Sequence, residues 1–350
     1  MSDIRSLLEK LSNAHGISGW EGNVQQIVMD EIKPYVDEVR VDALGNVIAT
    51  KKGEKPSIMI AAHADEIGLM VKQVDEKGFL RFIHIGGWYD PTLLNQRVIV
   101  HAKSGPVFGV VGSKPPHVMK EDERKKLIEA RDMFIDIGCQ SQEEAEDLGI
   151  APGTPISIDR TFASLQGDRV TGKAFDNRAG LVAMIEALKR TKSKSTIYAV
   201  ATVQEEVGLK GAKVSSYRLS PDIALATDVT IPGDHPGIDK KDAPIEMGMG
   251  PVIVIADASG RGLMATPSIV DWLVGTAKEF NIQVQLEASD GGTTDATAIY
   301  LTKEGIPTGV LSVAARYIHS PVEVLSLNDV DNAAELMARA LETATKYFRA

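Results

Sequence analysis

Four short apolar runs, each ending at or followed by a histidine or an acidic residue, limit most strongly what this chain can fold into. They span residues 57–62, 195–200, 222–228 and 308–313. A continuous apolar run of this length, rich in β-branched residues, predicts a strand that is buried on both faces of a sheet. Because ligands in open α/β sheets bind at the carboxyl ends of the strands, the residues that follow these runs are candidates for a functional site.

Helical patterns alternate with these runs. Apolar residues recur at helical spacing in 4–11, 24–32 and 181–188, and further helices are expected at 267–280 and from Asn328, as the cap, towards Tyr347. Strands that alternate with helices predict an α/β fold. The length of 350 residues leaves room for two domains.

The pattern changes after the first of the four runs. Between residues 67 and 160, short alternating segments and frequent turns predict strands at 68–74, 79–83, 97–101 and 106–111. The charged stretch from Glu121 to Arg131 predicts a solvated surface helix. We therefore expect a small β-rich domain at 67–160, inserted into an α/β domain formed by 1–66 and 161–350.

Charge and cysteine content exclude some classes of partner. The formal charge of −10 is not offset by any basic tract, which argues against a nucleic-acid partner. Cys139 is the only cysteine, so no intrachain disulfide can form, as expected in a reducing cytoplasm. The N-terminal stretch lacks the apolar core of a signal peptide, and no apolar run is long enough to span a bilayer. We therefore expect a cytoplasmic protein without a membrane partner.

Two of the strand ends carry pairs of candidate site residues. Glu205 and Glu206 follow the run 195–200, where one carboxylate can bind a metal while its neighbour faces a water; a solvated acidic turn is the alternative. His63 and Asp65 follow the first run and lie two residues apart, hence on one face of an extended segment. They can approach one site as a metal ligand and its hydrogen-bonded partner, or His63 can be purely structural.

Three further candidates come from the second half of the chain. Asp176 precedes the helical stretch at 181–188, where it can cap the helix or serve as a carboxylate ligand that the helix N-terminus keeps ionised. Asp228 ends the third apolar run, and His319 follows the fourth. The loop 290–296 contains two glycines, which permit close approach to a ligand or simply form a turn.

Together these residues predict a metal centre. Two histidines and three acids at the same edge of one sheet suit two adjacent divalent ions bridged by one carboxylate (His63, Asp176, Glu206, Asp228 and His319). Glu205, beside a ligand, is placed to act as a general base. A two-metal site activates water near neutral pH and polarises a carbonyl group.

Four motifs in this order resemble those of the tetrahedral (TET) aminopeptidases, which are co-catalytic metallo-aminopeptidases related to the glutamyl and deblocking aminopeptidases. The motifs are His63–Gly68, Ala174–Arg178, Glu205–Gly208 and Tyr317–Pro321. The resemblance covers essentially the whole chain, including the stretches 85–88 and 94–97 of the insert.

The resemblance implies a role for each candidate. His63 and Asp228 would hold one ion, Glu206 and His319 the other, and Asp176 would bridge them. Glu205 would be the general base, and Asp65 would orient His63 and raise its basicity. The ions would be zinc or cobalt, because the ligand set suits both.

The same resemblance implies a fold and an assembly. The fold would be a phosphorylase/peptidase-like mixed sheet flanked by helices, with a β-barrel-like dimerisation domain inserted at 67–160. The assembly would be a dodecamer whose active sites face an internal cavity, and the substrates would be short peptides that lose their N-terminal residue.

Two other functions remain open on the sequence. A deacylase or carboxypeptidase can use the same dinuclear chemistry, and a non-catalytic metal-binding protein can share the fold, although it would not need Glu205. Selectivity for an acidic N-terminal residue would require a basic group in the pocket, for which Arg316, Arg261 and Lys241 are the candidates.

Overall fold

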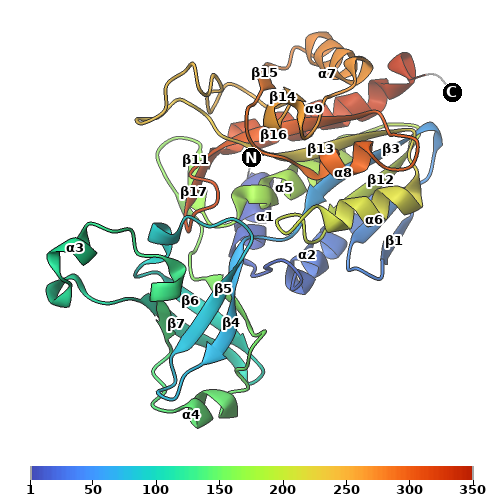
Figure 1. Ribbon diagram of the computed structural model, residues 1–350. Helices are drawn as coiled ribbons and strands as arrows, with labels where there is room; N and C mark the ends of the chain where they lie inside the picture. The colour runs from blue at the N-terminus through green and yellow to red at the C-terminus, as the bar shows by residue number, and fades with distance from the viewer. Residues whose placement is uncertain (1, 349–350) are drawn as a thin grey trace.

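The computed structural model describes residues 2–348, which form a mixed sheet covered by helices and a separate closed barrel (Figure 1). The layered part contains the first and the last of the described residues, and the barrel lies at the lower left of Figure 1. This architecture confirms the predicted fold class.

The large sheet contains eleven strands of mixed direction. In spatial order its main path runs β1 (Glu38–Val41), β2 (Val47–Lys51), β12 (Ser195–Thr202), β3 (Glu54–His63), β13 (Ile223–Thr230), β16 (Thr308–Arg316), β17 (Glu323–Ser326), β11 (Arg169–Gly172) and β10 (Ala163–Ser164). Two more strands continue from β16 off this path, β14 (Val252–Ala256) and β15 (Gln285–Ala288).

The four strands predicted from apolar runs form the parallel centre of this sheet. β12, β3, β13 and β16 pair in parallel, with Thr202 opposite His63 and Asp228 opposite Ser312. Side chains alternate between the two faces, so Ile58 and Ile60 enter one apolar cluster while Met59 and Ala61 enter another. Burial on both faces explains why these strands lack the apolar–polar alternation of an exposed sheet.

Helices cover both faces of the sheet. Five pack into the larger apolar cluster, α1 (Ser2–Asn13), α2 (Gly22–Ile32), α5 (Phe175–Arg190), α7 (Pro267–Glu279) and α9 (Leu327–Tyr347). Two cover the opposite face, α6 (Lys210–Leu219) and α8 (Asp295–Tyr300). Short 3₁₀ turns occur at Lys33–Tyr35, Asp90–Leu93, Pro116–Val118, Ala130–Asp132 and Ala258–Gly260.

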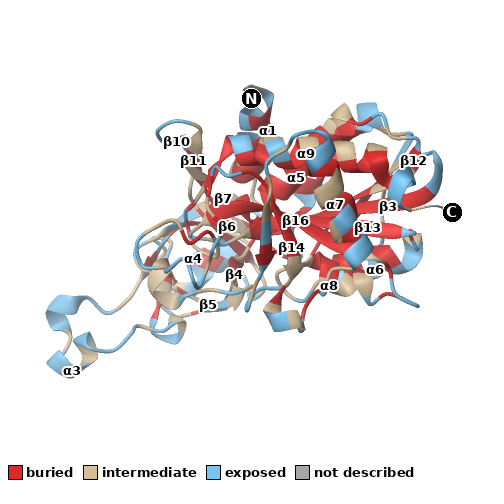
Figure 2. Ribbon diagram, turned by 90° about the horizontal axis from the view of Figure 1, so that it is seen from above, coloured by how far each residue is buried: buried red, intermediate tan, exposed pale blue. Residues whose placement is uncertain are grey.

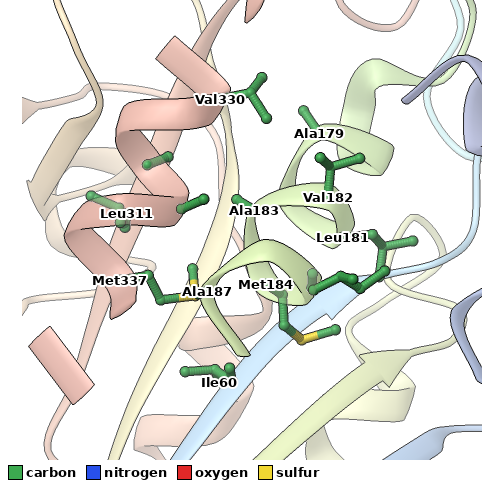
Figure 3. Close-up of a cluster of buried hydrophobic side chains, with 14 of the residues drawn as sticks. Ile60, Ala179, Leu181, Val182, Ala183, Met184, Ala187, Leu311, Val330 and Met337 are labelled. Atoms are coloured by element: carbon green, nitrogen blue, oxygen red, sulfur yellow. The ribbon is translucent and has the colours of Figure 1, made fainter. Parts of the chain in front are cut away.

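The core is centred on α5, which is buried along almost its whole length (Figure 2). Alanines recur every four residues along α5, at Ala179, Ala183 and Ala187. Their small side chains let α9 approach closely, and Val330 and Met337 of α9 pack against this part of α5 (Figure 3). A helix buried on nearly all sides needs no polar face, which explains the unbroken non-polar run at 179–185. This packing fixes the start of α5, where Asp176 lies.

The barrel is closed by six antiparallel strands and has its own apolar core. In order around the barrel they are β4 (Gly68–Val74), β5 (Leu80–Ile85), β8 (Phe134–Asp136), β7 (Gly105–Gly112), β6 (Arg97–Ala102) and β9 (Pro155–Ile158). Closure removes the exposed edges that an open sheet of this size would present. Two short helices decorate it, α3 (Glu121–Arg124) and α4 (Gln142–Asp147).

Several sequence expectations need correction. The charged stretch 121–131 is α-helical only to Arg124; beyond it Leu127 is exposed, while Ile128 and Ala130 pack against the apolar core of the barrel. Asn328 lies inside α9, whose cap is Ser326, since the Ser326 hydroxyl accepts a hydrogen bond from the amide of Asp329. The strands β8, β9 and β17 were not predicted, because each has only three or four residues.

Within residues 2–348, no helix combines the length and apolar character needed to cross a bilayer.

Candidate metal centre

A cleft of about 680 Å³ opens at the carboxyl edge of the parallel strands. Its lining includes His63, Asp176, Glu205, Asp228 and His319. Glu206 lines it too, so every predicted metal ligand and the predicted base meet there. The edge position follows from the topology, since parallel strands end on the same side of the sheet.

The first group of ligand atoms surrounds His63 at the end of β3. Its Nε2 atom lies 3.1 Å from Oδ1 of Asp176 and 3.8 Å from Oδ1 of Asp228. The ligand atoms of these three residues all lie within 4.8 Å of one another, which suits a single divalent ion.

The second group surrounds His319 in the loop after β16. Its Nε2 atom lies 3.5 Å from Oδ2 of Asp176 and 3.4 Å from Oε2 of Glu206. Asp176 therefore directs one oxygen to each group. The two groups share only this carboxylate, which is the arrangement that a bridging ligand requires.

Both imidazoles are held by their other ring nitrogen. Nδ1 of His63 lies 3.2 Å from the carbonyl oxygen of Asp65, and Nδ1 of His319 lies 3.0 Å from the carbonyl oxygen of Gly87. A neutral ring with its proton on Nδ1 leaves Nε2 free to bind a metal. Gly87 follows β5 of the barrel, and a Cβ atom there would lie 3.0 Å from Nδ1 of His319, so only glycine permits this approach without displacement.

Asp65 connects the ends of β3 and β12. Its carboxylate accepts hydrogen bonds from the amides of Glu205 (3.0 Å) and Glu206 (3.1 Å) and from the Ser18 hydroxyl (2.6 Å), and it lies 3.5 Å from Nδ1 of His63. Asp65 therefore orients the acidic pair as well as the histidine. Asp65 is fully buried.

Glu205 lies at the edge of the centre. Its Oε2 atom is 4.0 Å from Nε2 of His63, and the residue is 9% exposed and lines the cleft. It also belongs to a third group of potential ligand atoms with His63 and Glu206. This position, beside the ligands and open to the cleft, suits a group that exchanges protons with a bound water.

The helix-cap alternative for Asp176 does not hold. Asp176 and Asn177 have non-helical backbone angles at the start of α5, and the Asn177 side chain caps the regular helix by accepting a hydrogen bond from the amide of Gly180 (2.9 Å). The amide of Asp176 donates to Oε2 of Glu323 at 2.9 Å. The Asp176 carboxylate is thus free to face both histidines.

The charges of the centre are unbalanced. Burial acts to lower the pKa of His63, but Glu205, Asp176, Asp228 and Asp65 outweigh it and raise that pKa well above its usual value. The Asp176 carboxylate, which accepts from the protonated imidazole, raises the pKa of His319 to about 9.

The pKa values of the two glutamates are raised as well. Burial, together with the nearby Asp176 carboxylate, raises the pKa of Glu206 to about 8. Burial likewise raises the pKa of Glu205 well above its usual value. A cluster of desolvated carboxylates of this kind is stabilised in its ionised form by divalent cations.

A buried ion cluster that the sequence did not predict supports the metal centre. Glu66 is buried and pairs with Lys173 at 2.7 Å and Arg178 at 3.4 Å, while Lys173 also donates to the carbonyl oxygen of Ala14. This ion cluster ties the end of β3 to the start of α5. Glu66 and Arg178 lie inside motifs that carry metal ligands, and Lys173 directly precedes one, so their positions were a usable signal.

Two further acids near the centre were also missed. Glu323 supports the backbone of Asp176, and Asp295 at the start of α8 accepts a hydrogen bond from the Thr202 hydroxyl. Both are buried, and burial raises the pKa of Asp295 to about 7. Neither follows an apolar run, but Asp295 belongs to the glycine-containing loop 290–296 that the sequence marked as a possible ligand contact.

The basic residues considered for an acidic pocket are mostly elsewhere. Arg316 forms a two-pronged pair with Asp234 (2.9 and 2.7 Å), and Lys241 pairs with Asp239. Neither belongs to the cleft lining. Arg261 does line the cleft, but it is exposed and its Nε donates to the carbonyl oxygen of Ala258.

Known proteins are similar to this chain in fold and in sequence. Residues 45–336 match the M42 glutamyl aminopeptidase family. An aminopeptidase structure from Desulfurococcus kamchatkensis is 46% identical, with a TM-score of 0.93 over 97% of this chain and 95% of its own. The lysyl aminopeptidase of Pyrococcus furiosus is 39% identical over 96% of each chain.

A third relative relates the chain to self-assembling peptidases. The TET1 peptidase of Pyrococcus horikoshii, described as assembling into a tetrahedron or a large octahedral shell, is 35% identical with a TM-score of 0.87 over 97% of this chain and 99% of its own. These matches confirm the resemblance noted in the motifs. The chain belongs to the M42 glutamyl aminopeptidase family.

Proposed function

We propose that this chain is a metal-dependent aminopeptidase, which releases the N-terminal residue of short peptides with a water activated by two divalent ions, zinc or cobalt. The observation that carries the proposal is the pair of ligand groups that share Asp176, with Glu205 beside them facing the cleft. Family membership supports the reaction class.

The donor set fits two such ions. His63, Asp176 and Asp228 would hold one, and Asp176, Glu206 and His319 the other. Imidazole and carboxylate ligands suit both zinc and cobalt. When bound, the ions would polarise the scissile carbonyl group and lower the pKa of a coordinated water.

The protein's own groups would manage the protons. Glu205 accepts a proton from the attacking water while the oxygen of that water forms a bond to the carbonyl carbon. It then returns that proton to the nitrogen of the departing peptide as the C–N bond breaks. Asp65 holds the Glu205 backbone through its amide, which fixes where the carboxylate can reach.

The reaction class is tested with matched substrates. Leucine p-nitroanilide with a free amine is expected to be cleaved. Release of p-nitroaniline from its N-acetylated form is expected to be slower by at least about 100-fold, because the site would bind the free amine in the transition state. Chelation should abolish turnover, and added zinc or cobalt should restore it. Release of acetate from the acetylated substrate would replace this proposal with the deacylase alternative, and release of the C-terminal residue from a peptide would replace it with the carboxypeptidase alternative.

Metal uptake is expected to release protons. The pKa of His319 is raised to about 9 and that of Glu206 to about 8, so in the metal-free protein at neutral pH both hold a proton that a bound ion must displace. Apparent metal affinity should therefore rise as pH increases from neutral through 8 to 9. Calorimetric titration at pH 7 in two buffers of different ionisation enthalpy measures this release, and buffer-independent heats would contradict it.

We also propose that the subunits assemble, as a dodecamer, through the inserted domain at 67–160. The assembly described for the Pyrococcus horikoshii relative supports an oligomer. The outer face of β7 supports the choice of domain, because Phe108 and Val110 are 65% and 45% exposed on neighbouring positions of one strand face. A cytoplasmic location is part of the same proposal, since the single Cys139 permits no intrachain disulfide.

The assembly proposal predicts a change in mass. Replacing Phe108 and Val110 with Asp should yield smaller species in light scattering, because buried charges disrupt an apolar interface. Leu301→Asp is the matched control, as Leu301 is 66% exposed but lies after α8, outside the barrel. If the double variant keeps the parent mass, these side chains do not form the contact.

A further inference from the structure

The cleft extends beyond the metal centre towards β14 and β15. Thr230 lies two residues after Asp228 on β13, so both side chains project from the same face of that strand. Thr230 also lines the cleft, together with Val254 of β14 and Glu287 of β15. This extension begins directly beside a metal ligand, where the side chain of an N-terminal residue would lie.

Two buried acids line this extension. Glu287 is 7% exposed, and both its carboxylate oxygens accept from the single Thr230 hydroxyl, at 2.9 and 2.8 Å. Asp257 is 3% exposed, and its Oδ1 accepts from the amide of Leu263. Oδ2 of Asp257 is buried without a hydrogen-bond partner among the described residues.

Within residues 2–348, no lysine, arginine or histidine forms an ion pair with either acid. Among the described residues that line the cleft, Arg261 is the only lysine or arginine, and it is exposed with its Nε bonded to the carbonyl oxygen of Ala258. Asp290 adds another acid at the exposed rim. A desolvated carboxylate pair without a counter-charge is costly, and a bound cation relieves that cost.

We propose that Asp257 and Glu287 bind the side-chain cation of the substrate's N-terminal residue and thereby select lysine or arginine. The inference rests on the proposed aminopeptidase function and names its substrate class. The four-carbon stem of lysine would pass Val254 and Thr230, and its ammonium group would reach the two carboxylates. Arginine offers the same charge with a planar donor set that matches a carboxylate.

The direct test is binding of free amino acids to the metal-loaded protein, which requires no turnover. L-lysine and L-norleucine share the aliphatic stem and differ by the ammonium group. Calorimetry should show L-lysine binding about 10- to 100-fold more tightly, the range expected for a desolvated charge-assisted contact. Equal affinities, or tighter binding of L-glutamate, would overturn the proposal.

Substitutions assign the preference to its residues. Glu287→Gln preserves shape and the contact with Thr230, and should remove most of the lysine preference while leaving L-norleucine affinity unchanged. Glu287→Lys should reverse the preference towards L-glutamate. Asp290→Asn, at an exposed acid of the same cleft, is the matched control and should change the ratio less than about twofold, as exposed charges contribute little.

Three results separate this inference from the proposed function. Lysine selectivity that survives both Glu287 variants and Asp257→Asn would overturn the assignment even if peptides are cleaved. Selectivity that disappears in these variants supports it. If selective binding is present but the loaded protein releases no N-terminal residue from any peptide, the pocket stands and the aminopeptidase proposal fails.

Discussion

The Glu205→Gln protein is expected to keep both metal ions and its assembly while losing about 10²–10⁴-fold in kcat, the range for a general acid–base group. Gln has the size and hydrogen-bonding shape of Glu but cannot accept a proton. Because Glu205 lies beside the ligands without being needed for either three-residue group around Asp176, the metal sites should remain intact. KM should change less than kcat, since the lost interaction develops in the transition state.

Metal content measured on the same sample separates the base from a ligand. Loss of one ion in Glu205→Gln would make Glu205 a ligand, as its grouping with His63 and Glu206 allows geometrically. Gln204→Ala is the matched control, because Gln204 is the preceding residue and lies outside the cleft lining. If the Glu205→Gln protein with both metal ions bound has the same kcat as the unsubstituted protein, Glu205 is not the general base.

Asp176→Asn should weaken both ions together. The Asp176 carboxylate places one oxygen 3.1 Å from His63 and the other 3.5 Å from His319, so its replacement removes a charged ligand from each group. We expect affinity at both sites to fall by more than about 100-fold, because even partners outside the ligand shell contribute about 10- to 100-fold. Turnover should fall at least as far.

The control for this variant is Asp228→Asn. Asp228 belongs only to the group around His63, so its loss should weaken one ion and spare the other. Elemental analysis after dialysis against a weak chelator measures how many metal ions each variant retains, and so distinguishes the loss of both ions from the loss of one. An Asp176→Asn protein that retains one ion at parental affinity would contradict the bridging role.

The sequence predicted the parallel centre of the sheet well, because burial on both faces leaves a continuous apolar run. The run 57–62 lies within β3, and the histidine that follows it is the last residue of that strand. Because ligand-type residues follow such runs, the predicted site residues could be named before the fold was known. Their convergence follows from parallel pairing, which brings the strand ends to one edge.

The parts that could not be predicted depend on contacts between distant segments. Gly87 supports His319 across more than 200 residues of sequence, and no local pattern signals that contact. Asn177 and Asp176 are both plausible helix caps by residue type, and only the backbone turn at the start of α5 decides between them. The acidic pair of Asp257 and Glu287 arises from the pairing of β14 with β15, two strands separated by α7.

The most direct test of the dinuclear centre is a crystal structure of the cobalt- or zinc-loaded protein with anomalous scattering recorded at the metal edge. We predict two anomalous peaks per subunit, one between His63 and Asp228 and the other between Glu206 and His319, with Asp176 contacting both. A single peak at full occupancy, in a crystal of enzyme that is fully active with one ion per subunit, would contradict the account.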